Sequence, residues 1–346
     1  MASDPSSGFR LNVLNPGGRD PEQHFGTTAV TNVASHAPVN FHAYAACTGG
    51  SFFRETKKAI AARSPVLLLL RGDFRASERA LLELKKAGVP VAVSLKETGL
   101  HQIAAQLRDR RRLERFLRIV READGCIAPT PEAADMFRLI RGNDPASVFI
   151  PTPYPLHDPR WDFSRALEER RGILVGTREW DVPSRNHCAA LLAARQISEV
   201  TGEAVTVFDF GGPKTARLLA ELGFPAGKLR VLKERTGYAD YLRLVAQHKI
   251  VFQFDTSFVP GQVAGDALLC RVPCVGGNGA IERIAFPEIC GARRSIAELV
   301  EVAIDLLTKH DTYTQVIAGS QQAAAERLSF AAVAAQLRCY AAIASE

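Results

Sequence analysis

The chain has 346 residues, of which 47% are hydrophobic and 23% are charged. This composition is typical of globular proteins and excludes a disordered or collagen-like chain. The longest apolar run, 65–70, is far shorter than the roughly 20 residues that cross a bilayer, so the pattern predicts no transmembrane helix. The seven cysteines are odd in number and scattered, which predicts reduced thiols and a cytoplasmic location.

The formal net charge is +6, and all of the excess lies in the first half of the chain. Residues 1–171 contain 25 Lys and Arg against 19 Asp and Glu, whereas residues 172–346 contain 18 of each. The densest basic segment, 108–121, has apolar residues at helical spacing and predicts a basic amphipathic helix. Such a helix is either a solvated face or a contact with an anionic membrane surface, which would make the protein peripheral at the inner face of the membrane. Nucleic acid is disfavoured, because no stacking aromatic residues are interleaved with the arginines.

Short β-rich runs alternate with helical patterns in the first half, which is typical of parallel sheets covered on both faces. Strands are expected at 10–14, 39–44, 66–70, 89–95, 125–128 and 148–150. Helices are expected at 51–62, 76–87, 107–121 and 131–141.

The second half restarts the same alternation after a segment with four prolines in 151–159, which predicts an interdomain linker over 151–171. Strands are expected at 172–175, 205–208, 230–232, 250–254 and 272–275. Helices are expected at 186–201, 215–222, 238–247, 261–270, 296–307 and 313–343. The predicted architecture is α/β, with two doubly wound Rossmann-like domains, 1–150 and 172–328, facing each other across a cleft.

Several familiar chemistries are absent from the sequence. It contains no dinucleotide-binding glycine fingerprint, no P-loop and no G-x-S-x-G nucleophile turn. No His/Cys cluster has metal-ligand spacing, so we expect neither a metal nor a cofactor.

Glycine-rich turns follow three of the expected strands: Gly17-Gly18, Gly211-Gly212 and Gly276–Gly279. Each turn alone fits an ordinary tight connection between a strand and a helix. Glycine also lets the backbone approach a ligand, and helix N-termini offer free N–H groups to anions. Three such turns at strand ends favour a ligand site over a purely structural role.

Two arginines, Arg178 and Arg185, lie just past the first strand of the second half. Guanidinium groups match phosphate geometry with paired N–H donors, so the two side chains could clamp a diphosphate. The alternative is a surface loop that carries incidental arginines.

The order and spacing of these pieces resemble the GT-B-fold glycosyltransferases, specifically the retaining nucleotide-sugar group that includes the glycogen-synthase-like enzymes (glycosyl transferases group 1). The match is specific in the second half and weak in the first. The segments that carry it are 122–130, Ile150-Pro151, 173–176, 209–213, Thr256-Ser257 with Gly261, Asp266-Ala267, 271–275, and 328–330 with Tyr340. The resemblance implies that the terminal helix, in 329–346, returns to the first domain.

The resemblance also implies roles for individual residues. On the donor side it places Gly176, Gly211, Gly212, Phe258, Gly261, Asp266 and Glu282, with Asp266 holding the ribose. Arg178 and Arg185 would neutralise the leaving diphosphate. The acceptor side would carry Gly17, Gly18, Glu97, Lys96 and His101, of which His101 is the more conventional acid or base and is equally compatible with a structural role.

This sequence departs from the family at three positions. Aligned on Gly261, the two family glutamates fall at Phe258 and Asp266, and the family histidine falls at Lys96. An aspartate still accepts hydrogen bonds from ribose hydroxyls, and a return to glutamate should be tolerated there, whereas phenylalanine cannot replace a carboxylate that contacts the sugar.

The function that the resemblance implies is metal-independent transfer of a sugar, with retention of configuration, from a nucleotide-sugar donor to a glycan, lipid-linked or small-molecule acceptor. Two alternatives stay open. One is a nucleotide-sugar epimerase with a similar two-domain fold. The other is a catalytically degenerate domain that binds a nucleotide or glycan.

Overall fold

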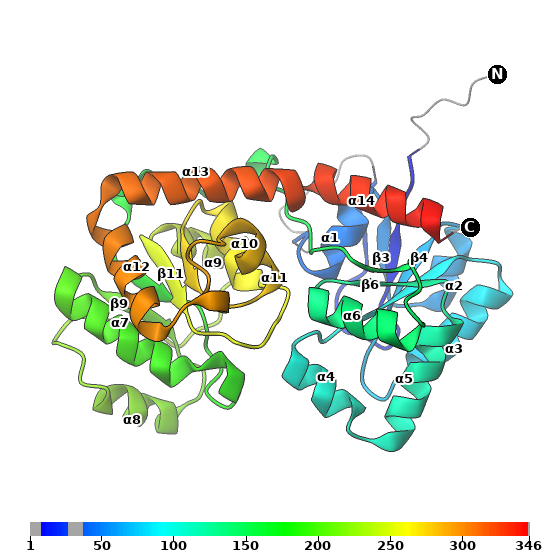
Figure 1. Ribbon diagram of the computed structural model, residues 1–346, viewed down its shortest axis with the longest axis horizontal. Coiled ribbons are helices and arrows are strands. Elements are labelled where there is room, and N and C mark those ends of the chain that lie inside the picture. The colour runs from blue at the N-terminus through cyan, green and yellow to red at the C-terminus, as the bar shows by residue number, and fades with distance from the viewer. Residues whose placement is uncertain (1–7, 27–36, 345–346) are drawn as a thin grey trace. The chain divides into compact units, whose positions relative to one another are not determined.

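The computed structural model describes residues 8–26 and 37–344. The chain forms two compact units (Figure 1): unit 1 comprises Met1–Pro155 and Leu328–Glu346, and unit 2 comprises Leu156–Arg327. The change from one unit to the other at Pro155 lies inside the segment that the sequence predicts as a linker. In the described part of the chain, no helix is long and apolar enough to span a bilayer.

Unit 1 is built on a seven-stranded sheet with the order β2-β3-β1-β4-β5-β6-β7, in which only the β2–β3 pair is antiparallel. Its strands are β1 (Asn12–Leu14), β2 (Gln23–His24), β3 (Ser51–Phe53), β4 (Val66–Leu70), β5 (Val91–Leu95), β6 (Gly125–Ala128) and β7 (Ser147–Phe149).

Both faces of this sheet are apolar, because alternate residues of each strand point to opposite sides. Leu68 and Leu70 of β4 belong to one buried cluster, and Leu67 and Leu69 belong to another. The first cluster is covered by α2 (Thr56–Ala61), α3 (Arg75–Lys86), α4 (Leu100–Leu107), α5 (Arg110–Glu122) and α6 (Pro131–Ile140).

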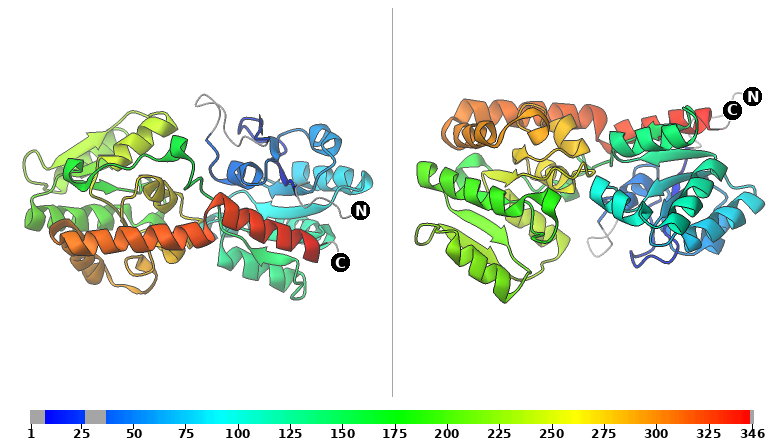
Figure 2. Two further views of the ribbon diagram at one scale, coloured as in Figure 1. Left: turned by 90° about the horizontal axis from the view of Figure 1, so that it is seen from above. Right: turned by 60° about the horizontal axis from the view of Figure 1, so that its bottom comes forward.

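The second face is covered by α1 (Phe41–Ala46) and by the last helix of the chain, α14 (Phe330–Ile343). Val333, Leu337 and Tyr340 of α14 enter the buried cluster, and this helix, drawn in red, lies against the body of unit 1 in both views of Figure 2. Backbone contacts between Tyr154 and 328–329 bring the chain back to unit 1.

Unit 2 contains a five-stranded parallel sheet with the order β10-β9-β8-β11-β12. Its strands are β8 (Ile173–Val175), β9 (Val205–Phe208), β10 (Leu229–Leu232), β11 (Ile250–Gln253) and β12 (Cys274–Gly276). The long helices α7 (His187–Thr201) and α12 (Ile296–Thr308) pack side by side and contact the sheet, and α9 (Tyr238–Ala246) packs on α10 (Gln262–Leu269). The other helices are α8 (Pro213–Glu221), α11 (Ala280–Ala285) and α13 (His310–Arg327).

Two expected elements in the first half are wrong. The segment 39–44 is expected as a strand, but it forms the fully buried helix α1; a short apolar run does not distinguish a buried strand from a buried helix. The segment 51–62 is expected as one helix, but it splits into strand β3 and helix α2.

Two expected long helices are also interrupted. The segment 313–343 divides into α13 and α14, and the Ser329 hydroxyl accepts a hydrogen bond from the Ala332 N–H at the start of the second helix. The basic helix begins at Arg110 rather than at Leu107, because Asp109 caps it by accepting from the Arg112 N–H at 3.0 Å.

Candidate functional site

The strand order of unit 2 defines where a ligand would bind. The chain runs from β8 outward through β9 to β10 and then returns to β11 on the other side of β8. Open parallel sheets bind ligands beyond the carboxyl ends of their strands where the order reverses. The loops after β8 and β11 therefore form the candidate site.

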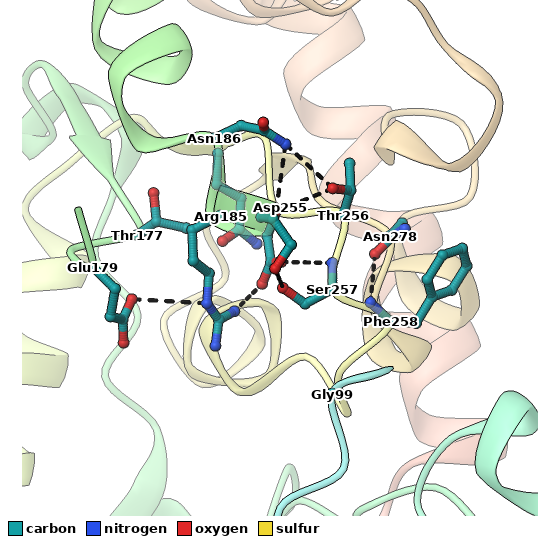
Figure 3. A network of polar contacts seen from close by, with 12 residues as sticks. Gly99, Thr177, Glu179, Arg185, Asn186, Asp255, Thr256, Ser257, Phe258 and Asn278 are labelled. Carbon is teal, nitrogen blue, oxygen red and sulfur yellow. Dashed lines mark hydrogen bonds and ion pairs between the residues drawn. The ribbon is translucent and has the colours of Figure 1, made fainter. Parts of the chain in front are cut away.

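An ion-pair network joins these two loops (Figure 3). Arg185, in a short turn at Pro183–Arg185, pairs with Asp255 just after β11 and lies 3.8 Å from a Glu179 carboxylate oxygen. Asp255 is 3% exposed and also accepts from the Ser257 N–H at 2.8 Å. The charge of Arg185 is thus held by carboxylates of unit 2 itself.

Arg178 has a different environment. Its guanidinium lies over the Phe210 ring at 5.9 Å, and the Arg235 guanidinium lies over the same ring at 5.6 Å. Neither arginine has an ion-pair partner within the described ranges 8–26 and 37–344. These three side chains follow β8, β9 and β10, so they place two exposed cations at the carboxyl edge of the sheet.

Sequence reasoning missed Arg235, which belongs to no motif. The signal was its position three residues after an expected strand.

The glycines of the donor side serve tight packing. A Cβ at Gly176 would lie 2.6 Å from the Val263 side chain, and one at Gly211 would lie 2.3 Å from Thr215. Gly212 has a φ of 77° and precedes α8. The Gly211 N–H donates to Asp209 at 3.0 Å, so this turn is closed by its own carboxylate.

Glu282 fills the space left by three glycines. A Cβ at Gly261 or Gly279 would lie 2.1 or 2.4 Å from its Oε2 atom, and one at Gly277 would lie 3.0 Å from Oε1. Its Oε1 accepts from Gln253 at 2.9 Å, whereas its buried Oε2 has no partner. Burial raises the pKa of Glu282 to about 7. This carboxyl therefore lies beneath the glycine loops and shapes them from inside.

Phe258 occupies a strained position in the same region. Its φ of 51° lies in the left-handed region, and its N–H donates to the Asn278 side chain at 3.0 Å. The Arg283 guanidinium lies 5.5 Å from its ring. Phe258 thus contributes a fixed apolar ring next to the loop after β11.

Asp266 lies within α10 and is 2% exposed. Its Oδ1 accepts a 2.5 Å hydrogen bond from the Tyr238 hydroxyl. Burial raises the pKa of Asp266 to about 7, although the Tyr238 hydrogen bond acts in the opposite direction.

His187, the first residue of α7, is a second polar group that sequence reasoning missed. Its Nδ1 lies 3.0 Å from the Thr177 hydroxyl, its ring contacts Trp180 edge-on, and burial lowers its pKa to about 4. The imidazole is therefore neutral at pH 7 and orders the loop that carries Arg178.

Unit 1 gathers charged groups at the carboxyl edge of its own sheet. Lys96, after β5, pairs with Asp20 at 3.0 Å, and the Asn15 amide donates to Asp20 at 2.8 Å. The Arg71 guanidinium donates to the Gly17 carbonyl at 2.6 Å. The structure therefore brings Lys96 together with the loop that follows β1.

The remaining acceptor-side predictions lie near this cluster. A Cβ at Gly18 would lie 2.2 Å from the Asn15 amide, which requires glycine there. Burial raises the pKa of Glu97, next to Lys96. His101 is half-buried in the first turn of α4. Sequence reasoning missed Asp20, although it follows Gly17-Gly18 directly after Arg19.

The described part of the chain contains no group of three or more His, Cys, Asp or Glu side chains that could hold a metal ion. Metal independence stays a prediction.

Comparison with known proteins gives a fold and no sequence family. No family model matches the chain. No curated protein matches it either. Among solved structures, Anabaena HepE in complex with UDP is similar over 96% of this chain and 100% of its own, with a TM-score of 0.65 and 14% identity. A glycosyltransferase from Rickettsia africae covers 97% of this chain and 99% of its own, with a TM-score of 0.60 and 12% identity.

A UDP-forming trehalose-phosphate synthase from Burkholderia xenovorans is similar over 90% of this chain and 81% of its own, with a TM-score of 0.55 and 11% identity. The chain has the GT-B fold. The predicted resemblance in fold and the predicted class of two Rossmann-like domains are confirmed. Within the GT-B fold, unit 2 is the domain in which the sequence places the donor.

Proposed function

We propose that this protein is a glycosyltransferase that moves a sugar from a nucleotide-sugar donor to an acceptor. The observation that carries the proposal is the unpaired Arg178 guanidinium beyond β8, where the strand order of unit 2 reverses. The GT-B fold supports it, and HepE, which has this fold, has been solved in complex with UDP-glucose.

The chemistry requires a group that stabilises the leaving diphosphate. Breaking the anomeric carbon–oxygen bond transfers negative charge to the nucleotide, and fixed cations and N–H dipoles can stabilise it without a metal. Arg178 supplies an exposed cation over Phe210. Arg185 is already paired with Asp255, so only its remaining N–H groups are available to a phosphate. Metal independence and retention of configuration are part of the proposal and rest on the resemblance.

The acceptor would contact the Lys96–Asp20 cluster of unit 1 together with Gly17, Gly18 and Glu97. Its class (glycan, lipid-linked or small molecule) is open, because the cluster offers both a cation and carboxylates.

A non-catalytic role as a nucleotide or glycan binder is the second candidate. It is favoured by Phe258, which replaces a family carboxylate, and by the hydrogen bond that Asp266 already makes with Tyr238.

Calorimetry with UDP, GDP and ADP, followed by turnover of the matching nucleotide sugars, tests both candidates. A transferase binds one diphosphate and releases it from its sugar donor. Binding without release in the presence of a panel of acceptors indicates the binder, and no binding contradicts both.

We also propose that α5 contacts an anionic membrane surface. Arg115 and Arg118 pair with Glu78, and Arg110 pairs with Glu114. The other basic side chains of the segment are exposed and have no ion pair within the described residues: Arg108, Arg111, Arg112 and Arg121. Each cation near such a surface contributes about 1 kcal/mol.

Sedimentation with liposomes tests this contact. Wild-type protein should sediment with anionic and not with neutral liposomes, and less so as salt rises. The variant Arg111→Glu/Arg112→Glu should stay in the supernatant, whereas the matched change Lys214→Glu/Arg217→Glu on α8 of unit 2 should not alter binding. Equal recovery with neutral and anionic liposomes would indicate a merely solvated face.

A further inference from the structure

Asp266 is the residue for which the resemblance implies a direct contact with ribose, yet its carboxyl lies below the surface. Only 2% of the residue is exposed, and its Oδ1 accepts a 2.5 Å hydrogen bond from the Tyr238 hydroxyl. A buried carboxyl that already accepts a short hydrogen bond is poorly placed to receive a ligand by itself. The group above it, the Tyr238 hydroxyl, is the better candidate for the contact.

Tyr238 is the first residue of α9, so it lies at the carboxyl edge of the sheet, just after β10. Its ring packs 5.9 Å from the Trp161 ring and 6.4 Å from the Tyr241 ring. These contacts fix the direction of its hydroxyl, while the residue itself stays partly exposed.

A tyrosine hydroxyl that donates to a carboxylate still has an oxygen that accepts hydrogen bonds. Donation to a carboxylate polarises the hydroxyl, which makes its oxygen a stronger acceptor. A vicinal diol such as ribose supplies the O–H donors that such an oxygen binds. The Arg178 cation acts on Asp266 from nearby, so the pair lies next to the cation assigned to the diphosphate.

We propose that the Tyr238 hydroxyl receives the ribose hydroxyls of a bound nucleotide and that Asp266 is the positioning residue behind it. This inference rests on the proposed function. It divides between two side chains a task that one glutamate performs in the related family. A purely structural link that ties α9 to α10 is the competing explanation, since these helices pack together.

Calorimetry with UDP and with 2′,3′-dideoxy-UDP separates the two explanations; GDP and ADP with their dideoxy forms replace them if UDP does not bind. Tyr238→Phe keeps the ring and removes the hydroxyl. It should weaken binding of the ribonucleotide about tenfold, which corresponds to about 1.4 kcal/mol, and leave the dideoxy form unchanged. Asp266→Asn should act in the same direction, and the double variant should bind no more weakly than the weaker single variant.

Tyr241→Phe is the matched control, because it removes a hydroxyl from the neighbouring ring, for which no hydrogen bond to Asp266 is found within the described residues. It should bind both nucleotides like the wild type. Near-ultraviolet circular dichroism of each variant checks that the rings stay packed.

Three results would overturn the inference. Tyr238→Phe may weaken both forms equally, which indicates a structural link, or neither form, which indicates no contact. If the wild-type protein binds none of the three ribonucleotides, the proposed function fails and takes this inference with it.

Discussion

At the carboxyl edge of the sheet in unit 2, the carboxyl groups of Asp255, Asp266 and Glu282 are almost completely buried. At the same edge of the sheet in unit 1, the side chains of Asp20 and Lys96 are 34% and 24% exposed. Both edges come from parallel strands in the same kind of domain. The difference indicates a preorganised site in unit 2, where charges are fixed before a ligand arrives, and a solvated, adjustable one in unit 1.

The largest expected effect follows from breaking one ion pair in each unit. Arg185→Met leaves the buried Asp255 without its cation and should lower the free energy of unfolding by about 3–5 kcal/mol. Lys96→Met leaves Asp20 partly exposed and should cost at most about 1 kcal/mol. Both tryptophans, Trp161 and Trp180, belong to unit 2, so tryptophan fluorescence during urea unfolding follows the first variant, and circular dichroism follows the second.

The double variant Arg185→Met/Asp255→Asn is the control for this comparison. Because it removes both charges, it should recover most of the lost stability. Equal losses in Arg185→Met and Lys96→Met would show that burial does not distinguish the two edges.

The next effect concerns catalysis at the preorganised edge. Arg178→Ala should reduce kcat/KM about 10²–10³-fold, the range for loss of a fixed charge stabiliser, with little change in stability because Arg178 is exposed. Arg230→Ala, an exposed arginine on the edge strand β10, should leave kcat/KM unchanged.

Arg185 is tested in the stable double variant, for which the resemblance predicts a similar reduction in kcat/KM. Near-wild-type kinetics for both Arg178→Ala and the double variant would remove the diphosphate assignment.

A smaller effect is expected in the pH dependence of stability. The folded pKa of Asp266, about 7, lies above its ordinary value of 3.8, so the folded protein binds the proton more tightly than the unfolded chain. The resulting stabilisation is complete below about pH 4 and is lost as the pH rises through 7. Asp266→Asn lacks this dependence.

The stability of Asp266→Asn relative to the wild type should therefore rise by a few kcal/mol between pH 4 and pH 8, which tryptophan fluorescence in urea measures. A constant difference across that range would contradict the burial of an ionisable carboxyl. Asp266→Glu is informative as well. The resemblance predicts tolerance, whereas the buried site beneath Tyr238 predicts a loss of about 1–3 kcal/mol from the added methylene group.

The smallest effect belongs to unit 1. Burial acts to raise the pKa of Asp20, but the hydrogen bond and charge of Lys96 outweigh it, and the pKa is lowered. Asp20 therefore contributes stability above its ordinary pKa of 3.8, and this contribution is lost as the pH falls below that value. Asp20→Asn should change the stability at pH 7 by less than about 1 kcal/mol. A larger loss, measured by circular dichroism, would mean that this edge is preorganised too.

The sequence by itself determined the fold class and most of the sheet. The runs that form β4, β8 and β9 are apolar throughout and bounded by turns, so their strand character is local. The positions of Arg178 and Arg185 after β8 could be read directly for the same reason. The apolar run 67–70 also showed that both faces of the first sheet must be covered.

Only the tertiary structure decided which segments cover those faces and which charges pair. That α14 lies on the sheet of unit 1 depends on contacts with strands more than 200 residues away in the sequence. Arg178 and Arg185 have equal standing in the sequence, yet Arg185 meets Asp255 from a loop 70 residues later and Arg178 meets no carboxylate in the described part of the chain. The physical reason is that β8 and β11 are neighbours only after the sheet has formed, and the energy of an ion pair depends on distance and burial in space.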